Sequence, residues 1–281
     1  MSEALAAVPE AQIRADVARA LDEDLGALDL TAQLLPAWAR ADALILCRDP
    51  ALLCGVAWAA QAFRALDPEI ELDWQYRDGD QVPADTRLVR IRGKARAIVS
   101  AERTALNFLQ TLSATATLTR RYVDALAGTR CRVLDTRKTL PGLRLAQKYA
   151  VRVGGGSNHR LGLYDAVLIK ENHIRAAGSI AQAIAAARAI AGPRMVEIEV
   201  ESLAEFEIAL AAGPDRIMLD ELPRPDLERA VAINRGRVEL EISGGVTLEQ
   251  IRELAGVGVD YISVGALTKN IQAIDLSLRL E

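Results

Sequence analysis

The stretch MVEIEVESLAEFEIALAAGPDRIML (195–219) decides the fold, because it places two short apolar runs around one segment of helical length. The runs MVEIEV (195–200) and RIML (216–219) have the length of β-strands. Residues 202–212 between them have the pattern of an amphipathic helix. Strand, helix and strand in this order predict a βαβ unit, whose two strands lie parallel.

The same rhythm continues on both sides of this stretch. Further apolar runs are CRVLD (131–135), AVLI (166–169), VELEI (238–242) and YISVG (261–265), with helix-length segments at 179–191 and 247–255. Six such runs predict a parallel sheet covered by helices. Polar residues recur after nearly every run, and such strand ends meet at one mouth in a barrel. We therefore expect an α/β barrel rather than an open, doubly wound sheet.

The residues before the barrel have a different pattern, which predicts a small α+β domain. Ile13, Val17 and Leu21 have helical spacing. Strand-like runs cover 43–47, 70–76, 87–91 and 95–99, Asp78-Gly79-Asp80 is a turn signal, and a long helical pattern covers 100–126. We divide the chain into an N-terminal domain over 1–126 and a barrel domain over 127–281, the last segment of which can pack back on the N-terminal domain.

Composition excludes several classes of protein. The chain has 281 residues, of which 51% are hydrophobic and 26% charged, and its net charge of −4 gives no reason to expect a nucleic-acid partner. No apolar run reaches the roughly 18–20 residues that a membrane span needs. The acidic N-terminus lacks the basic region of a secretory signal. Three cysteines and two histidines match neither a disulfide framework nor a zinc site. We expect a soluble cytoplasmic protein.

Charged or loop-forming residues follow every apolar run of the barrel. They are Asp135, Arg137, Lys138, Lys170, Glu171, Glu199, Glu201, Asp220, Glu221, Ser243, Gly244, Gly245 and Gly265. Cations and two carboxylates at one mouth suit an anionic substrate associated with a metal ion. The Ser-Gly-Gly loop and the loop Gly265-Ala266 match the phosphate site of barrels, where backbone N–H groups approach the anion. The alternative for any one residue is a solvated strand end or a helix cap.

Segment 135–175 contains eight of the basic residues and both histidines. We interpret Arg144, Lys148 and Arg152 as a basic, solvated helix face. His159 has two open interpretations from spacing alone, a core or capping histidine and a site residue. The glycine triplet 154–156 lacks the spacing of a nucleotide-binding loop, so a nucleoside triphosphate or dinucleotide site has no support.

Long motifs of this chain resemble the quinolinate phosphoribosyltransferase family, also called carboxylating nicotinate-nucleotide pyrophosphorylase. They are DTRKTLPGLR (135–144), KYAVRVGGGSNHRLGLYDAVLIKENHI (148–174), EIEVES (197–202), IMLDE (217–221), EISGGV (241–246) and DYISVGALTK (260–269), with ERTALNFLQTLSATATLTRRYVDA (102–125) and DGDQV (78–82) in the N-terminal half. The resemblance implies an N-terminal α/β sandwich, an open six- or seven-stranded α/β barrel, and a dimer with shared sites that can join a higher assembly. Departures at Leu28, Ala114 and Leu140 remove no charged group.

The resemblance also implies a reaction and roles for individual residues. Quinolinate and phosphoribosyl pyrophosphate would give nicotinate mononucleotide, pyrophosphate and CO₂, with Mg²⁺. Arg137, Arg160 and Arg103 match the family's carboxylate-binding residues, the last reaching the site from the partner subunit. Lys138, His159 and Lys170 would line the same pocket, and both lysines would reach the pyrophosphate. Ser243, Gly244, Gly245, Gly265 and Ala266 would bind the 5-phosphate, and Glu199 and Asp220 the ribose hydroxyls and Mg²⁺.

Other functions remain open from the sequence. One is a paralogous phosphoribosyltransferase of the same scaffold, of the type associated with molybdenum transport. Another is a barrel lyase that uses Lys170 as a Schiff-base amine. A third is an anion-binding scaffold protein without turnover.

Overall fold

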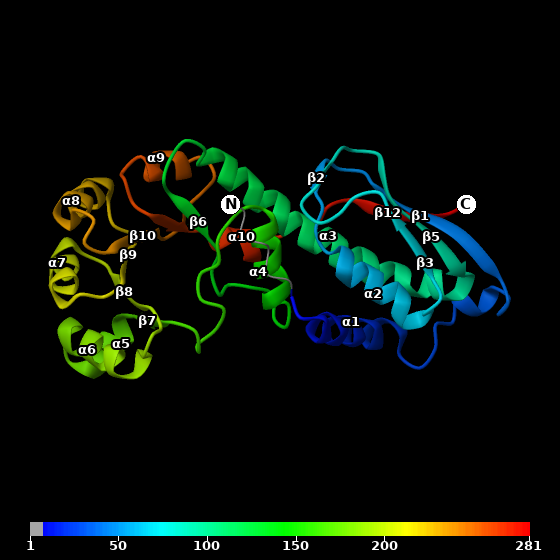
Figure 1. The fold of residues 1–281 in the computed structure, drawn as a ribbon, viewed down its shortest axis with the longest axis horizontal. Coiled ribbons are helices and arrows are strands. Elements are labelled where there is room, and N and C mark those ends of the chain that lie inside the picture. The colour runs from blue at the N-terminus through cyan, green and yellow to red at the C-terminus, as the bar shows by residue number, and fades with distance from the viewer. Residues whose placement is uncertain (1–7) are drawn as a thin grey trace. The chain divides into compact units, whose positions relative to one another are not determined.

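A computed structural model describes residues 8–281 (Figure 1). The first seven residues, which begin the acidic N-terminal stretch, lie outside the described residues. The described chain forms two compact units. The first contains the described residues up to Arg120 together with Leu140–Gly155 and Asn270–Glu281, and the second contains Arg121–Thr139 and Gly156–Lys269. The sequence division after residue 126 is simpler, because it assigns 140–155 and 270–281 to the barrel domain.

The first unit is built on a four-stranded antiparallel sheet in the order β12-β1-β5-β3. These strands are β1 (Arg40–Cys47), β3 (Glu71–Trp74), β5 (Thr86–Lys94) and β12 (Leu276–Leu280), and a small second pair joins β2 (Ala51–Leu52) to β4 (Gln81–Val82). The strands predicted at 43–47, 70–76 and 87–91 are therefore confirmed. The predicted turn is also confirmed, since the Asp80 N–H donates to the Arg77 carbonyl at 3.1 Å and Gly79 has a φ of +95°.

Helices complete the core of the first unit. They are α1 (Glu10–Leu25), η1 (Ala32–Leu34), α2 (Val56–Leu66), α3 (Ala95–Ala125) and α4 (Arg144–Val153). The predicted apolar face of α1 is buried, as are Leu106, Leu109 and Leu112 of α3. Replacing one of these buried leucines by alanine would cost about 2–5 kcal/mol of stability, because it would leave a cavity.

Two predictions for the first unit are wrong. Residues 95–99 form the first turns of α3 and not a strand, because Ala95, Ile98 and Ala101 bury one helical face. The β-branched residues there suggested a strand, but burial at intervals of three residues outweighs this local preference. On α4, Lys148 is fully buried, so this helix does not present the solvated basic face that we expected.

The second unit contains the predicted six-stranded parallel sheet, in the order β6-β11-β10-β9-β8-β7. Its strands are β6 (Arg132–Leu134), β7 (Val167–Ile169), β8 (Val196–Val200), β9 (Arg216–Asp220), β10 (Glu239–Ser243) and β11 (Tyr261–Ser263). From β7 to β11 each strand pairs with its successor in the chain, and β11 then pairs with β6. This is the topology of a barrel left open between β6 and β7, as predicted.

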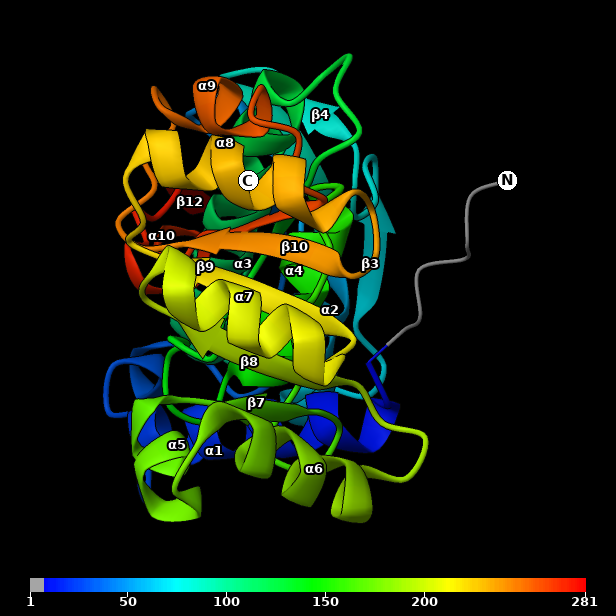
Figure 2. The ribbon, with the colours of Figure 1, turned by 90° about the vertical axis from the view of Figure 1, so that its left-hand side faces the viewer.

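Helices follow the strands of this sheet. They are α5 (Glu171–Ala177), α6 (Ile180–Ala191), α7 (Leu203–Ala212), α8 (Arg224–Asn234), α9 (Ile251–Ala255) and α10 (Ala266–Lys269). Figure 2 shows α6, α7 and α8 over one face of the strands β7 to β10. Ser179 and Ser202 cap α6 and α7, since each hydroxyl accepts a backbone N–H of the first turn at 3.3 Å.

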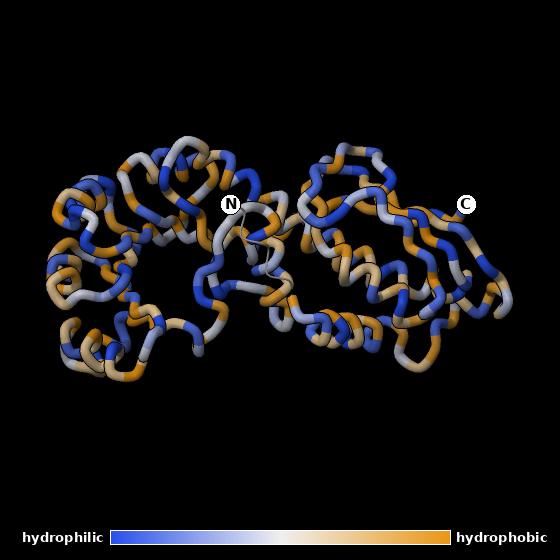
Figure 3. Tube along the Cα trace, in the orientation of Figure 1, coloured by the Kyte–Doolittle hydropathy of each residue, from blue (hydrophilic) through white to orange (hydrophobic). Residues whose placement is uncertain are grey.

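Alternation along β8 separates two environments. Val196, Ile198 and Val200 are fully buried on the face that the helices cover, while Glu197 and Glu199 point to the opposite, inner face. Hydrophobic and hydrophilic segments also alternate over short distances along the rest of the trace (Figure 3). Among residues 8–281, no helix combines the length and apolar character that a membrane crossing requires.

Candidate active site

The carboxyl ends of the parallel strands bring most of the predicted site residues to one edge of the sheet. Glu199, Asp220 and Ser243 lie at the ends of β8, β9 and β10, and Lys170 follows β7 directly. Gly265 comes two residues after β11. Because neighbouring strands are in parallel register, Ser243 stands opposite Asp220. The predicted convergence of charged strand ends is present in the second unit.

Lys170 and Glu199 are paired with each other. The Lys170 Nζ contacts Glu199 Oε2 from the neighbouring strand end, with 46% of the lysine side chain exposed and 13% of the carboxylate. The backbone N–H of Lys170 also donates to His173 Nδ1 at 2.9 Å, which fixes the start of α5. The carboxylate lies at the inner edge of the sheet, and the lysine reaches it from the solvent side.

A pocket of about 670 Å³ combines three of the predicted cations. Arg137, Arg160 and Lys170 line it together with His173, and its other walls are apolar side chains, most of them from β7 and α6. Burial lowers the pKa of Arg160, and the positive charge of Arg137 lowers it further. Two guanidinium groups held this close favour an anionic ligand, and an apolar wall favours a flat ring.

The loop that carries Arg160 has no regular secondary structure, and side chains accept its backbone N–H groups. The N–H of His159 donates to Asp135 Oδ1 at 2.9 Å, and that of Arg160 donates to His159 Nδ1 at 2.7 Å. The N–H groups of Leu161 and Gly162 donate to the two carboxylate oxygens of Asp165, at 2.6 and 3.0 Å. Four consecutive N–H groups thus have side-chain acceptors.

His159 lies against a buried group of charged residues on the inner face of the sheet. Its Nε2 is 2.9 Å from Glu197 Oε2 and 3.7 Å from Glu241 Oε2. Arg216 reaches Glu241 at 3.2 Å and the exposed Glu239 at 2.8 Å, and its guanidinium lies 4.0 Å over the Tyr261 ring. Both buried glutamates are inaccessible to solvent.

The ionisation of this buried group differs from that of ordinary carboxylates. Burial raises the pKa of Glu197 to about 7 and that of Glu241 to about 8, and the neighbouring Glu197 charge adds to the effect at Glu241. The Arg216 charge opposes the shift at both residues. The ligand atoms of His159, Glu197 and Glu241 lie within 4.8 Å of one another. Since Arg216 already supplies a cation to this group, we do not interpret it as a metal centre.

The predicted phosphate loops depend on two glycines. Gly244 has a φ of +104°, and a Cβ atom there would lie 2.4 Å from Glu221 Cγ. At Gly265 a Cβ atom would lie 3.1 Å from Lys138 Cδ, so the lysine stem lies directly across this glycine. The Lys138 carbonyl accepts the Thr268 hydroxyl at 2.8 Å, which ties the lysine to α10. Lys138 is therefore held beside the loop Gly265-Ala266.

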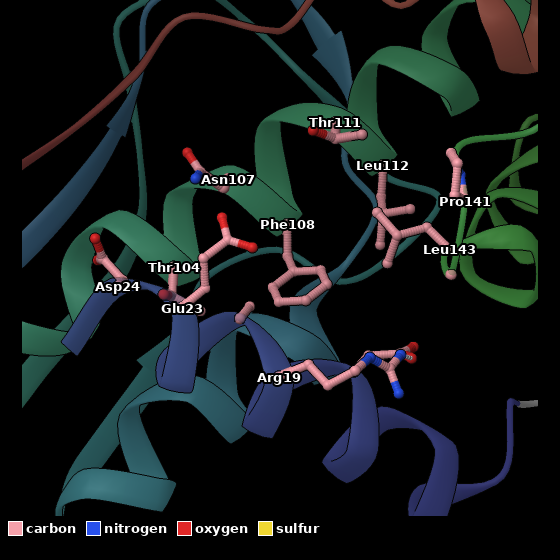
Figure 4. A pocket seen from close by; sticks show the side chains of 13 residues that line it. Arg19, Glu23, Asp24, Thr104, Asn107, Phe108, Thr111, Leu112, Pro141 and Leu143 are labelled. Carbon is pink, nitrogen blue, oxygen red and sulfur yellow. Dashed lines mark hydrogen bonds and ion pairs between the residues drawn. The ribbon is translucent and has the colours of Figure 1, made fainter. Parts of the chain in front are cut away.

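Arg103 belongs to the first unit, where it is exposed on α3. The next residue, Thr104, and Asn107 one turn later line a pocket of about 380 Å³ between α1, α3 and the segment 141–143. Figure 4 shows Phe108 and Leu143 pointing into this space, with Arg19 extending from α1. Arg103 therefore stands on the exposed face of a helix beside a pocket of its own unit.

Sequence reasoning missed the charged inner face and the loop acceptors. Glu197, Glu241 and Arg216 were included in apolar runs, although VEIEV and VELEI alternate strictly between glutamate and apolar residues. This period of two was the available signal for a polar inner face. Asp165 gave no comparable signal, because its function depends on a loop conformation that the sequence does not specify.

Two sequence profiles match nearly the whole chain. The profile for the N-terminal domain of quinolinate phosphoribosyl transferase matches residues 29–113, and the profile for its C-terminal domain matches 115–279. The nicotinate-nucleotide pyrophosphorylase [carboxylating] of Mycobacterium leprae is 43% identical over 95% of this chain and 96% of that protein. A relative in Bacillus subtilis, described as a probable enzyme of the same name, is 40% identical over 91% of this chain and 89% of that protein.

Solved structures agree with these matches. The nicotinate-nucleotide pyrophosphorylase of Francisella tularensis superimposes with a TM-score of 0.95 and 46% identity, over the full length of both chains. A structure from Streptococcus pyogenes, named NadC, superimposes with a TM-score of 0.93 and 40% identity, over 98% of this chain and 99% of that one.

Proposed function

The chain belongs to the quinolinate phosphoribosyltransferase family, and from this membership we propose how its residues carry out the reaction. The enzyme is a carboxylating nicotinate-nucleotide pyrophosphorylase (EC 2.4.2.19) of NAD biosynthesis. It transfers the phosphoribosyl group of phosphoribosyl pyrophosphate to quinolinate and releases nicotinate mononucleotide, pyrophosphate and CO₂.

The observation that supports the substrate assignment is the pocket that Arg137, Arg160 and Lys170 line together. Quinolinate is a flat ring with two adjacent carboxylates, so it needs cations in a fixed arrangement and an apolar surface for the ring. A guanidinium offers a planar pair of donors to a carboxylate, while a lysine offers a compact charge. Arg137 and Arg160 would hold the carboxylates and orient the ring nitrogen toward C1 of the ribose.

The chemistry requires charge stabilisation and orientation but no nucleophilic side chain. The ring nitrogen bonds to C1 as the C1–oxygen bond to pyrophosphate breaks, through a transition state with oxocarbenium character. Lys138 and Lys170 would stabilise the negative charge of the departing pyrophosphate. The loops Ser243–Gly245 and Gly265-Ala266 would hold the 5-phosphate, and His159 contributes to the quinolinate end of the site. The bond from the ring to the 2-carboxylate then breaks and CO₂ leaves. Its electron pair stays on the ring carbon as a carbanion that the adjacent pyridinium charge stabilises, and this carbon then takes up a proton from water.

Glu199 and Asp220 are the residues proposed to hold Mg²⁺. They end neighbouring strands and offer only oxygen ligands, which suits an ion that rests on one or two carboxylates and on substrate phosphates. When bound, Mg²⁺ supplies positive charge next to the pyrophosphate. The same two carboxylates would accept the ribose hydroxyls. A Schiff-base reaction at Lys170 is disfavoured, because its Nζ is engaged by Glu199 and not free as an amine.

The proposed assembly is a homodimer with shared sites, in which Arg103 enters the site of the partner subunit. Its exposure on α3 and its place in the family motif support this role. We further propose a cytoplasmic location, since the three cysteines are buried free thiols, the state that a reducing compartment maintains.

An assay of pyrophosphate and CO₂ release tests the substrate assignment. We expect release of both products with quinolinate and phosphoribosyl pyrophosphate. Nicotinate lacks the 2-carboxylate and would leave charged groups of the pocket unpaired, so it should react at least about 10³-fold more slowly in kcat/KM. Equal turnover of the two acids would overturn the assignment.

A further inference from the structure

Both ring nitrogens of His159 are directed at groups of the protein. Nδ1 accepts the Arg160 backbone N–H at 2.7 Å, and a nitrogen that accepts a hydrogen bond carries no proton. The proton of the neutral ring is therefore on Nε2, which lies 2.9 Å from Glu197 Oε2. The ring is buried and has no nitrogen left to donate to a ligand in the pocket.

We propose that His159 is a positioning residue that acts through Arg160, and that Glu197 is the group that fixes its ring. This inference rests on the proposed function, because it assigns to Arg160 the binding of a quinolinate carboxylate. The connection runs from the inner face of β8 through the imidazole to the backbone N–H of Arg160. The Arg160 side chain then lines the pocket with Arg137 and Lys170.

Glu197 is well placed for this role because its own position is rigid. It is the second residue of β8, and it pairs with Leu168 of β7 on one side and with Arg216 of β9 on the other. Its carboxyl group stands next to that of Glu241, which Arg216 contacts from the adjacent strand at 3.2 Å. Groups held by strands are placed more accurately than groups held by loops, so β8 can transmit a fixed position to a loop that lacks regular structure.

The other side-chain acceptors of this loop also fix the backbone around Arg160. Asp135 holds the N–H of His159, and Asp165 holds those of Leu161 and Gly162. The N–H of Arg160 is the one member of this run of four whose acceptor is an imidazole. The imidazole can accept at Nδ1 when its proton is on Nε2, and the Glu197 carboxylate stands 2.9 Å from that nitrogen.

Nuclear magnetic resonance of the imidazole nitrogens tests the ring directly. The chain has two histidines, so an enzyme labelled with ¹⁵N-histidine gives two ring spin systems, and a His173→Gln variant assigns them. We expect His159 to carry its proton on Nε2, both before and after addition of quinolinate. A proton on Nδ1, or a change of tautomer when quinolinate binds, would overturn the proposal. This test needs no substitution of Glu197.

Kinetics of two Glu197 variants test the effect on Arg160. Glu197→Leu removes the partner of Nε2, whereas Glu197→Gln keeps an oxygen acceptor there. Since a displacement of about 1 Å in a binding group can cost on the order of 10²-fold in rate, we expect Glu197→Leu to raise the quinolinate KM about 10- to 100-fold. The KM for phosphoribosyl pyrophosphate should stay within about threefold. Glu197→Gln should restore the quinolinate KM and the Nε2–H signal.

Glu239→Leu is the matched control, since Glu239 lies on the same inner face and contacts Arg216 but is exposed and is not one of the carboxylates that His159 Nε2 approaches. Its quinolinate KM should be that of the wild type. An unchanged quinolinate KM in a folded Glu197→Leu enzyme would overturn the positioning role. If the wild-type enzyme does not turn over quinolinate at all, the proposed function fails instead, and the tautomer measurement still reports separately on the ring.

Discussion

The Lys170 ammonium and the Glu199 carboxylate form an ion pair across the carboxyl ends of the neighbouring strands β7 and β8. The cation proposed to bind pyrophosphate and the anion proposed to bind Mg²⁺ thus hold each other in place. Neither group depends on a flexible loop for its position, because each is anchored next to a hydrogen-bonded strand.

Removal of the lysine should affect turnover strongly. We expect Lys170→Ala to lower kcat/KM by about 10²-fold or more, since it removes charge stabilisation of the leaving group and leaves Glu199 without its cation. The matched control is Lys94→Ala, which breaks a lysine–carboxylate pair with Asp67 in the first unit. That variant should keep kcat/KM within about threefold, because Lys94 belongs to the first unit and is not among the proposed site residues, although the buried Asp67 loses its cation. Steady-state pyrophosphate release measures both, and equal losses would refute a specific role for Lys170.

Substitution of Gly244 should disturb the phosphate loop. Alanine there would place a Cβ atom 2.4 Å from Glu221 Cγ at a φ of +104°. We expect Gly244→Ala to lose about 1–3 kcal/mol of stability and to raise the KM for phosphoribosyl pyrophosphate. Gly192→Ala is the control, because Gly192 also has a positive φ but no atom within 4 Å of the added Cβ. Denaturant unfolding and initial-rate measurements compare the two variants. Equal KM values for phosphoribosyl pyrophosphate would contradict the phosphate-binding role of the loop Ser243–Gly245.

The buried glutamates should make stability depend on pH. The pKa of Glu241 is raised from 4.5 to about 8 by burial, so the folded protein binds more protons than the unfolded chain between these values. The contribution of Glu241 to the free energy of unfolding should therefore be greatest below about pH 4.5. This contribution should be lost as the pH rises toward 8. Glu241→Gln should flatten the profile between pH 5 and 8, and Glu239→Gln should not. Denaturant titrations at several pH values measure this slope.

Arg103 should complement a defect in the partner subunit. Arg103→Ala and Lys138→Ala each inactivate the enzyme if both residues serve the site. When the two variants exchange subunits, each mixed dimer has one site with both defects and one with neither. Random exchange makes about half of the dimers mixed, so about a quarter of all sites should recover activity. No recovery after demonstrated exchange would show that Arg103 serves the site of its own subunit.

The sequence predicted the second unit more accurately than the first. Strand and helix alternate regularly from residue 131 onward, and parallel topology alone brings Glu199, Asp220 and Ser243 to one edge. The first turns of α3 were mistaken for a strand, because Ile98 and Val99 favour strands locally while burial against the core decides for helix.

The pairing of side chains within the site could not be predicted. Whether Lys170 meets Glu199 depends on the register between β7 and β8, which no local pattern fixes. The burial of His159 against Glu197 could not be predicted either, because it depends on a loop conformation that brings the imidazole onto the inner face of the sheet. Motifs identify such residues but not which atoms face each other.

The place of β12 in the first sheet has a consequence for synthesis on the ribosome. Arg48 follows β1 directly, and Ser277 lies within β12. The two residues are 229 positions apart in the chain, and the Arg48 side chain donates a hydrogen bond to the Ser277 hydroxyl at 3.3 Å. During translation, one edge of β1 stays unpaired until residues 276–280 have emerged from the ribosome. All strands of the parallel sheet are synthesised before that point. An unpaired strand edge can pair with other chains. The nascent enzyme is therefore open to aggregation at this edge until β12 pairs with it.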